Sequence, residues 1–505
     1  MERASRALNN IFFGFILRLA TMIGPFVVRI IITRTIGREF LGVSGVFSSL
    51  LSALALTEMG FASAVAYKCY SFYAKKDYLS IRKYLAFFKK IYRMVGTIII
   101  IIGLLLTPFL KYIVNGEIPD ELNLYTIYFV YLFNTGVSYF LGAYKSVILT
   151  VSQRQDIESR IAVVCNSFMY IMQIIVLALF RNYYVYLIFL PVSTILINII
   201  RIKKTNEIFP ELYVAGMISN EEKKSIFKSI VPLIGHRLQG TIVISADNVI
   251  ISTFIGVTMV AEYNNYYTII AALGSFITAI YAAIQPGIGN AMAMDNLEKN
   301  YNDFKRISFA MIWIVGWMSI CLVCLFEDFI EMAYGVQYKF GLITVLLLVA
   351  EFYIWRTFDI VMLYRDVVGR WSGDMIIPYI SGSVNLIVNI VLVKTIGVDG
   401  VIISTIISFV FVSIPFSIRV LFHEVFNISE KEYLIRYLLR TGVVFLTGFF
   451  TYFLCDYLVK WSTMINFMVK GIVCLILPNL AFYLIWHRSA EYKYFKSILI
   501  NRIKR

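Results

Sequence analysis

The chain reads IFFGFILRLATMIGPFVVRIII over residues 11–32. This run is apolar and long enough to cross the hydrocarbon core of a bilayer as one helix. Two positive charges, Arg18 and Arg29, nevertheless interrupt it. A charge near the bilayer centre costs several kcal/mol, so such a residue is retained only where it faces a protein interior or water. The stretch therefore predicts a membrane helix that lines the polar interior of a helical bundle.

Similar apolar runs recur along the whole chain. Of its 505 residues, 59% are hydrophobic and 15% are charged, and the mean hydropathy is +0.77. This composition is typical of a multi-pass membrane protein, and a soluble core has no need of it. We predict an all-α membrane protein with about fourteen transmembrane helices, near residues 8–33, 40–66, 86–110, 124–149, 160–180, 183–200, 226–254, 262–286, 307–330, 341–364, 375–393, 400–421, 436–458 and 463–486.

The distribution of basic residues predicts the orientation. Most of the 46 lysines and arginines fall in the termini and in the even-numbered loops, and few fall in the odd-numbered loops. By the positive-inside rule, both termini are expected in the cytoplasm, and the loop at residues 111–123 outside. The net charge of +15 then reflects topology and attraction to anionic membrane lipids, so no nucleic-acid partner is expected.

Cysteine and histidine usage gives no sign of a cofactor or a metal. The six cysteines are scattered through or beside the predicted spans. Cys321 and Cys324 have a CxxC spacing, but they lie in mid-helix with no further Cys or His nearby in the sequence. A structural zinc site needs four ligands. We therefore expect apolar packing for this pair, and neither a metal nor another cofactor for the protein.

A short internal repeat organises the chain. Residues 31–37 read IITRTIG at the end of the first span, and residues 250–256 read IISTFIG at the end of the seventh. Six spans separate the two copies, so the two halves are expected to have parallel topology. The resulting division is an N-terminal lobe (1–200, spans 1–6), a cytoplasmic linker (201–225), a C-terminal lobe (226–421, spans 7–12), two further spans (436–486) and a basic cytoplasmic tail (487–505).

Several stretches together resemble a known family. They are FGFILR (13–18), followed by Pro25 and Arg29, TIGREFLG (35–42), EMGF (58–61) and SADNVII (245–251). With fourteen spans arranged as six plus six plus two, the chain is similar to the Wzx-type polysaccharide (O-antigen) flippases of the MOP transporter superfamily. The resemblance implies translocation of an undecaprenyl-pyrophosphate-linked oligosaccharide across the bacterial plasma (inner) membrane by alternating access, without ATP.

The charges inside the spans are the candidate substrate-binding residues. Arg18 and Arg29 are eleven residues apart, which is three helical turns, so they share one face of the helix. Arginine offers a planar fork of donors that stays charged in a low dielectric and matches a diphosphate. We expect Arg18, Arg29 and Arg237, the last in the seventh span, to bind the substrate. A buried ion pair that fixes packing is the alternative role for Arg237. Arg29 lies only a few residues from the external end of its span, so its alternative is to snorkel to the membrane interface.

Two carboxylates inside spans are the candidates for ion coupling. Asp247 lies deep in the seventh span, and Glu58 lies in the second. Each could titrate or bind a cation during transport, or could serve as a counter-ion for an arginine. Arg356 and Asp359 are three residues apart in the tenth span, so we expect them to form a structural pair with each other.

Two other functional classes stay open. One is a different MOP transporter, either a lipid II flippase or an antiporter that exchanges drugs for cations; the arginines argue against cationic drugs. The other is an enzyme, a membrane glycan polymerase or glycosyltransferase, which usually needs a sizeable catalytic segment outside the membrane. No Ser-His-Asp arrangement or phosphate-binding loop occurs in the sequence, so no enzyme is expected. The expected partners are the lipid-linked oligosaccharide diphosphate, membrane lipids and a glycan polymerase.

Overall fold

The computed structural model describes residues 2–55, 61–116, 118–119, 121–224, 226–227, 245–368, 376–458 and 462–503. Throughout these ranges the regular structure is helical, without strands. Nine of the described helices are long and apolar enough to cross a membrane. The other predicted spans are not among these nine helices. Some of them are shorter, one carries more charged residues, and some fall partly outside the described residues. The predicted all-α membrane class is confirmed.

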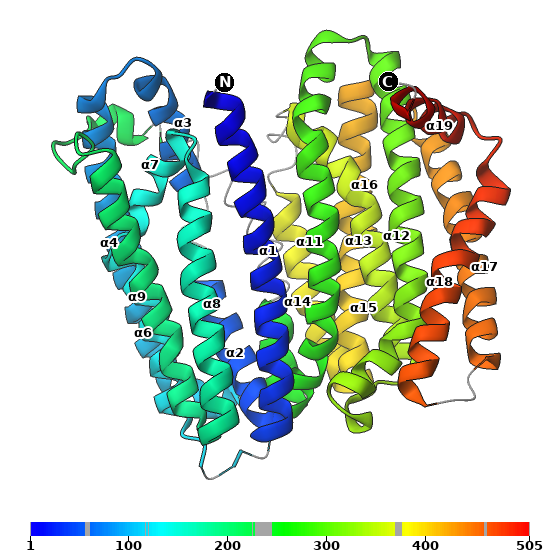
Figure 1. The fold of residues 1–505 in the computed structure, drawn as a ribbon, viewed down its shortest axis with the longest axis horizontal. Coiled ribbons are helices and arrows are strands. Elements are labelled where there is room, and N and C mark those ends of the chain that lie inside the picture. The colour runs from blue at the N-terminus through cyan, green and yellow to red at the C-terminus, as the bar shows by residue number, and fades with distance from the viewer. Residues whose placement is uncertain are drawn as a thin grey trace. The chain divides into compact units, whose positions relative to one another are not determined.

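The chain divides into two compact units, Met1–Glu262 and Tyr263–Arg505. The first unit contains the helices in the blue to green half of Figure 1. Their bounds are α1 (Glu2–Thr35), α2 (Arg38–Leu54), α3 (Phe61–Ala74), α4 (Tyr78–Leu106), η2 (Thr107–Phe109), α5 (Leu110–Ile113), α6 (Leu124–Phe140), η3 (Ala143–Lys145), α7 (Ser146–Val151), α8 (Gln155–Phe180), α9 (Tyr183–Ile208), a helix over 245–254, and the first turns of α11 (Val257–Met294).

Helix α1 packs along α8, as Figure 1 shows. The two helices approach closely where Gly24 of α1 meets the ring of Tyr170 on α8. A Cβ at Gly24 would lie 2.2 Å from Cδ2 of that ring, so only glycine allows this approach. This contact fixes the position of α1 along its axis relative to α8. It thereby also places Arg29, which lies one to two turns further along α1.

One predicted span is wrong in its extent. Residues 124–149 were expected as a single helix, but α6 ends at Phe140 and the chain continues through η3 into the short helix α7. The break coincides with Gly142, where a Cβ would lie 2.4 Å from Cγ1 of Ile202 and 3.2 Å from the carbonyl oxygen of Asn198 on α9. The close approach of α9 is a tertiary contact, which the hydropathy of the sequence does not reveal.

The two copies of the internal repeat end their helices in the same way. The N–H groups of Ile36 and Gly37 both donate to the carbonyl of Ile32, and those of Ile255 and Gly256 both donate to Ile251. The φ angles of the two glycines are 136° and 133°, a region that L side chains rarely adopt. Each glycine is the second residue of a two-residue connection between helices, 36–37 and 255–256. The same cap also ends α12 at Gly335, so the cap alone does not establish a repeat.

The second unit contains the rest of α11 and all later helices. Their bounds are α12 (Leu297–Ala333), η4 (Val336–Tyr338), α13 (Leu342–Val368), α14 (Ile377–Ile396), α15 (Val398–Ser408), the π-helical η5 (Phe409–Ser413), α16 (Ile414–Arg419), the π-helical η6 (Val420–Phe426), α17 (Lys431–Tyr457), α18 (Thr463–Trp486) and α19 (Ala490–Ile503). The predicted division into two repeated lobes stays a prediction. The two compact units are defined by contacts within one conformation, and such contacts do not test whether the two halves of the chain are repeats.

Helices α17 and α18 are held to α12 and α19 by polar contacts. The indole nitrogens of Trp313 and Trp317 on α12 each donate at 2.9 Å to α18, to Oδ1 of Asn479 and to the carbonyl of Cys474. On α17, the guanidinium of Arg440 lies 2.6 Å from the Glu491 carboxylate of α19. The last three helices of the described chain are therefore part of the second unit.

Candidate functional site

Two of the five predicted site residues are described in full. Arg237 and Glu58 lie outside the described residues, and so does the side chain of Arg18. Arg29 and Asp247 are both described, and both belong to the first unit. The candidate site is therefore built from these two residues and from the side chains around them.

Arg29 lies in the second half of α1 and is half-buried. Its Nη2 donates a hydrogen bond of 2.9 Å to the carbonyl oxygen of Ala261, at the start of α11. Its charge also acts on the hydroxyls of Tyr131 on α6 and Tyr186 on α9. A guanidinium has five donors in a planar fork.

Hydroxyl groups on α2, α6 and α9 lie near one another, and the charge of Arg29 reaches two of them, those of Tyr131 and Tyr186. The hydroxyls of Ser44 on α2 and Tyr183 on α9 are hydrogen-bonded to each other, and Tyr131 on α6 bonds to both. Tyr183 also donates to the carbonyl of Phe40 at 3.3 Å. We call Ser44, Tyr131, Tyr183 and Tyr186 the tyrosine cluster. Neutral donors and acceptors next to a fixed cation can bind an anion and the hydroxyls of a sugar together.

Asp247 lies on the helix over residues 245–254 and is 3% exposed. The neighbouring residue, Asn248, donates from Nδ2 to Oγ of Ser49 on α2 at 2.8 Å. The carboxylate is thus in a buried segment that a side-chain hydrogen bond joins to α2. The protonation of a buried carboxylate depends on the charges and donors that face it.

Hydrogen bonds and an ion pair join the segment of residues 245–262 to α1, α2 and residues 113–115, and we call five of them the closing contacts. The five pairs are Arg29–Ala261, Arg38–Glu262 (an ion pair at 2.7 Å), Ser49–Asn248, Ile113–Ser252 (2.7 Å) and Asn115–Val257 (2.9 Å). Gly42 of α2 packs directly on this segment, because a Cβ there would lie only 1.9 Å from the carbonyl oxygen of Val257. All of these contacts lie within the first unit.

A second group of charges lies in α13 of the second unit. Arg356 and Asp359 form the predicted pair at 2.8 Å, and the guanidinium lies against Gly274 of α11, where a Cβ would be 3.1 Å from Nε. Tyr281 of α11 donates to the Arg356 carbonyl at 3.0 Å. Glu351, on the same helix as Arg356, is within reach of its charge. Sequence reasoning missed Glu351, although a lone acid within the run LLLVAEFYIW was a sufficient signal.

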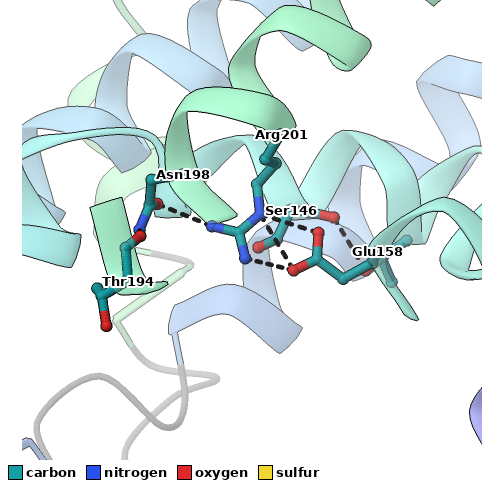
Figure 2. A network of polar contacts seen from close by, with 6 residues as sticks. Ser146, Glu158, Thr194, Asn198 and Arg201 are labelled. Carbon is teal, nitrogen blue, oxygen red and sulfur yellow. Dashed lines mark hydrogen bonds and ion pairs between the residues drawn. The ribbon is translucent and has the colours of Figure 1, made fainter. Parts of the chain in front are cut away.

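An ion pair between α8 and α9 was also missed. In Figure 2, the guanidinium of Arg201 faces the carboxylate of Glu158, and Asn198 continues the network along α9. Nε of Arg201 lies 2.8 Å from Oε2 of Glu158, and Nη1 donates to Oδ1 of Asn198 at 2.8 Å. The Arg201 side chain is 11% exposed. This arginine already has a carboxylate partner, so its role is to join two helices.

Comparisons with known proteins add the family. A family model described as "Polysaccharide biosynthesis protein" matches residues 7–292, which is more than half of the chain. The chain belongs to the polysaccharide biosynthesis protein family. No curated protein matches the sequence. The expectation from the sequence resemblance is confirmed at the level of family and superfamily fold.

Solved structures share the fold of this polysaccharide biosynthesis protein. The lipid II flippase MurJ, in an inward closed conformation, aligns with a TM-score of 0.73 at 12% identity, over 94% of this chain and 99% of that one. An inward-facing multidrug resistance transporter of the MATE family and MOP superfamily aligns with a TM-score of 0.59 at 15% identity, over 80% and 98%. The Vibrio cholerae MATE transporter VcmN gives 0.55 at 10% identity, over 80% and 94%.

Within this member of the polysaccharide biosynthesis family, Arg29 and the tyrosine cluster form the candidate site. The arginine was predicted from the sequence, and the tyrosines were not, because aromatic side chains in membrane proteins are usually attributed to interfacial belts and packing. Arg29 and Asp247 both belong to segments joined by the closing contacts. The roles predicted for all five residues, Arg18, Arg29, Arg237, Asp247 and Glu58, stay predictions.

Proposed function

We propose that the protein is a flippase that moves an undecaprenyl-pyrophosphate-linked oligosaccharide repeat unit across the bacterial plasma membrane. The observation that carries this proposal is Arg29, a half-buried guanidinium inside a membrane helix, beside the hydroxyls of Tyr131 and Tyr186. A diphosphate needs fixed cations in a low dielectric, and the adjoining sugar needs hydroxyl partners. The family match supports a glycan as the cargo.

The proposed cycle is alternating access coupled to an ion gradient. The closing contacts join residues 245–262 to α1 and α2 on the side that the distribution of basic residues predicts to be external. We infer that these contacts break when the path opens to that side, which frees Arg29 from the Ala261 carbonyl. Asp247 and Glu58 are the proposed coupling residues. A carboxylate whose surroundings change as the contacts break would bind and release a proton or cation once in each cycle.

The proposed setting follows from the sequence. Both termini lie in the cytoplasm, the cargo diphosphate and membrane lipids are the immediate partners, and a glycan polymerase receives the product on the outer face. Catalysis of a covalent step is not part of the proposed role. A lipid II flippase shares this fold. The function proposed here differs from that of a lipid II flippase in the lipid-linked cargo that is moved.

We expect the purified protein in proteoliposomes to move a fluorescent, lipid-linked oligosaccharide diphosphate between leaflets, measured by its accessibility to an impermeant quencher. The rate should depend on a proton or sodium gradient, and Asp247→Asn should remove that dependence while the cargo still binds. Lipid II serves as the second cargo. Movement of lipid II alone would overturn the proposed substrate, and an unchanged gradient dependence in Asp247→Asn would remove the coupling role.

A cysteine introduced at Glu121 should be labelled by a membrane-impermeant maleimide in intact cells. Glu121 is exposed in the loop that precedes α6, and the loop is predicted to be external. The native cysteines can stay, because five of the six are buried and the sixth is partly buried. A cysteine at Lys76, in the turn after α3, is the matched control and should be labelled only after the membrane is opened. The reverse pattern would invert the proposed orientation.

A further inference from the structure

Four of the six cysteines converge in the second unit. Cys324 on α12, Cys455 on α17 and Cys474 on α18 are 5%, 1% and 0% exposed, and their Sγ atoms all lie within 4.8 Å of one another. Cys321, one turn before Cys324 on α12, is hydrogen-bonded to the Cys474 thiol. We call these four residues the thiol cluster. Apolar packing, the role expected from the sequence, gives no reason for thiols from three helices to meet.

We propose that the thiol cluster is a binding site for a thiophilic d10 metal ion such as Zn²⁺, which joins α17 and α18 to α12. Thiolates are the preferred ligands of such ions, and a tetrahedral zinc site with bonds of about 2.3 Å places its sulfurs roughly 3.8 Å apart. The observed separations need only small side-chain adjustments to reach that value. Cys324, Cys455 and Cys474 supply three ligands, and Cys321, one turn away on α12, is the candidate for the fourth.

An ion pair lies near the thiol cluster. A metal binds cysteine as the thiolate, so metal binding releases the thiol protons. Lys470 lies one turn before Cys474 on α18, and its charge acts on Cys455. Its Nζ is 2.7 Å from Oδ2 of Asp328 on α12. This ion pair is neutral overall and joins α18 to α12 beside the thiol cluster.

The position of the cluster explains what a metal would contribute. Cys455 is two residues from the end of α17, and Cys474 is in the middle of α18. At this level α18 and α12 are joined by the Trp317 indole bond to the Cys474 carbonyl and by the Lys470–Asp328 pair. A metal that bridges three helices would add bonds much stronger than these hydrogen bonds. The site would thus act on the assembly of the last two spans, independently of the cargo.

The test is a Cd²⁺ titration of the reduced, detergent-purified protein, followed by the ultraviolet charge-transfer band of Cd²⁺–thiolate bonds. Wild-type protein should bind one Cd²⁺ per chain, and Zn²⁺ should displace it. Cys324→Ala and Cys474→Ala should lose the band or bind at least a hundredfold more weakly. Cys165→Ala is the matched control, since Cys165 is a buried cysteine on α8 outside the cluster, and it should titrate like wild type.

A second measurement on wild-type protein covers the case in which a variant does not fold. Zn²⁺ should slow alkylation of Cys455 by at least tenfold, as followed by peptide mass spectrometry, and should leave Cys165 unchanged. Absence of a stoichiometric band in wild-type protein would overturn the proposal. Equal loss of the band in Cys165→Ala would also overturn it. A disulfide between two cluster thiols in freshly isolated, unreduced protein would overturn it as well, because the cluster would then be a redox pair.

Discussion

Arg29→Ala is expected to lower transport of the lipid-linked cargo by roughly a hundredfold or more at equal protein level. The guanidinium can make two charge-assisted hydrogen bonds to a phosphate, and their loss costs about 3 kcal/mol, which is roughly a hundredfold in rate. Arg29→Lys should recover only part of the rate, because an ammonium keeps the charge but lacks the planar fork. The measurement is the quencher assay in proteoliposomes, together with surface glycan in cells.

Arg34→Ala is the control for this experiment, because Arg34 lies in the last turn of the same helix and is exposed. It should retain the wild-type rate. A thermal unfolding midpoint for each variant separates loss of function from loss of fold. If Arg29→Ala transports cargo as fast as wild type, Arg29 is a packing residue that holds the Ala261 carbonyl, and the proposed phosphate site is wrong.

Gly42→Ala is expected to destabilise the described conformation by about 1–3 kcal/mol, the usual range for inserting a methyl group into a filled contact. A Cβ at this position would lie 1.9 Å from the Val257 carbonyl oxygen, so α2 and the start of α11 must move apart. The movement would stretch the neighbouring Ser49–Asn248 hydrogen bond. The thermal midpoint of the detergent-purified protein should fall by several degrees.

Gly14→Ala is the matched control, since Gly14 is a helical glycine of the same unit at which an added Cβ would meet nothing within 4 Å. It should unfold at the wild-type temperature. Proteolysis or labelling at a cysteine placed at Ser49 should also increase in Gly42→Ala and stay unchanged in Gly14→Ala. Equal thermal midpoints for the two variants would show that the contact between α2 and Val257 accommodates an added methyl group without loss of stability.

Features that depend on neighbouring residues in the chain could be predicted from the sequence. Apolar runs of span length identified the membrane class, and the spacing of Arg356 and Asp359 identified their pair. Arg29 was recognisable because a charge within an apolar run is costly wherever the helix packs. These inferences use the periodicity of one helix, and they need no knowledge of what lies beside it.

Features that depend on separate helices meeting could not be predicted in this way. The thiol cluster combines a CxxC pair with Cys455 and Cys474, which are far away in the sequence, so the spacing of Cys321 and Cys324 alone indicated packing. The tyrosine cluster likewise draws its hydroxyls from α2, α6 and α9. The break after Phe140 reflects the approach of α9 to Gly142. In each case the deciding partner is brought close only by the tertiary fold.

The single glycines at positions 37 and 256 make connection length a constraint on function. Surface connections usually tolerate an extra residue, but each of these glycines belongs to a connection of only two residues between helices. One inserted residue would turn the following helix by about 100° relative to the preceding one. After Gly37, that rotation would carry Gly42 away from Val257 and Ser49 away from Asn248. Natural variation in length should therefore be absent at these two points and concentrated in longer connections such as residues 114–123.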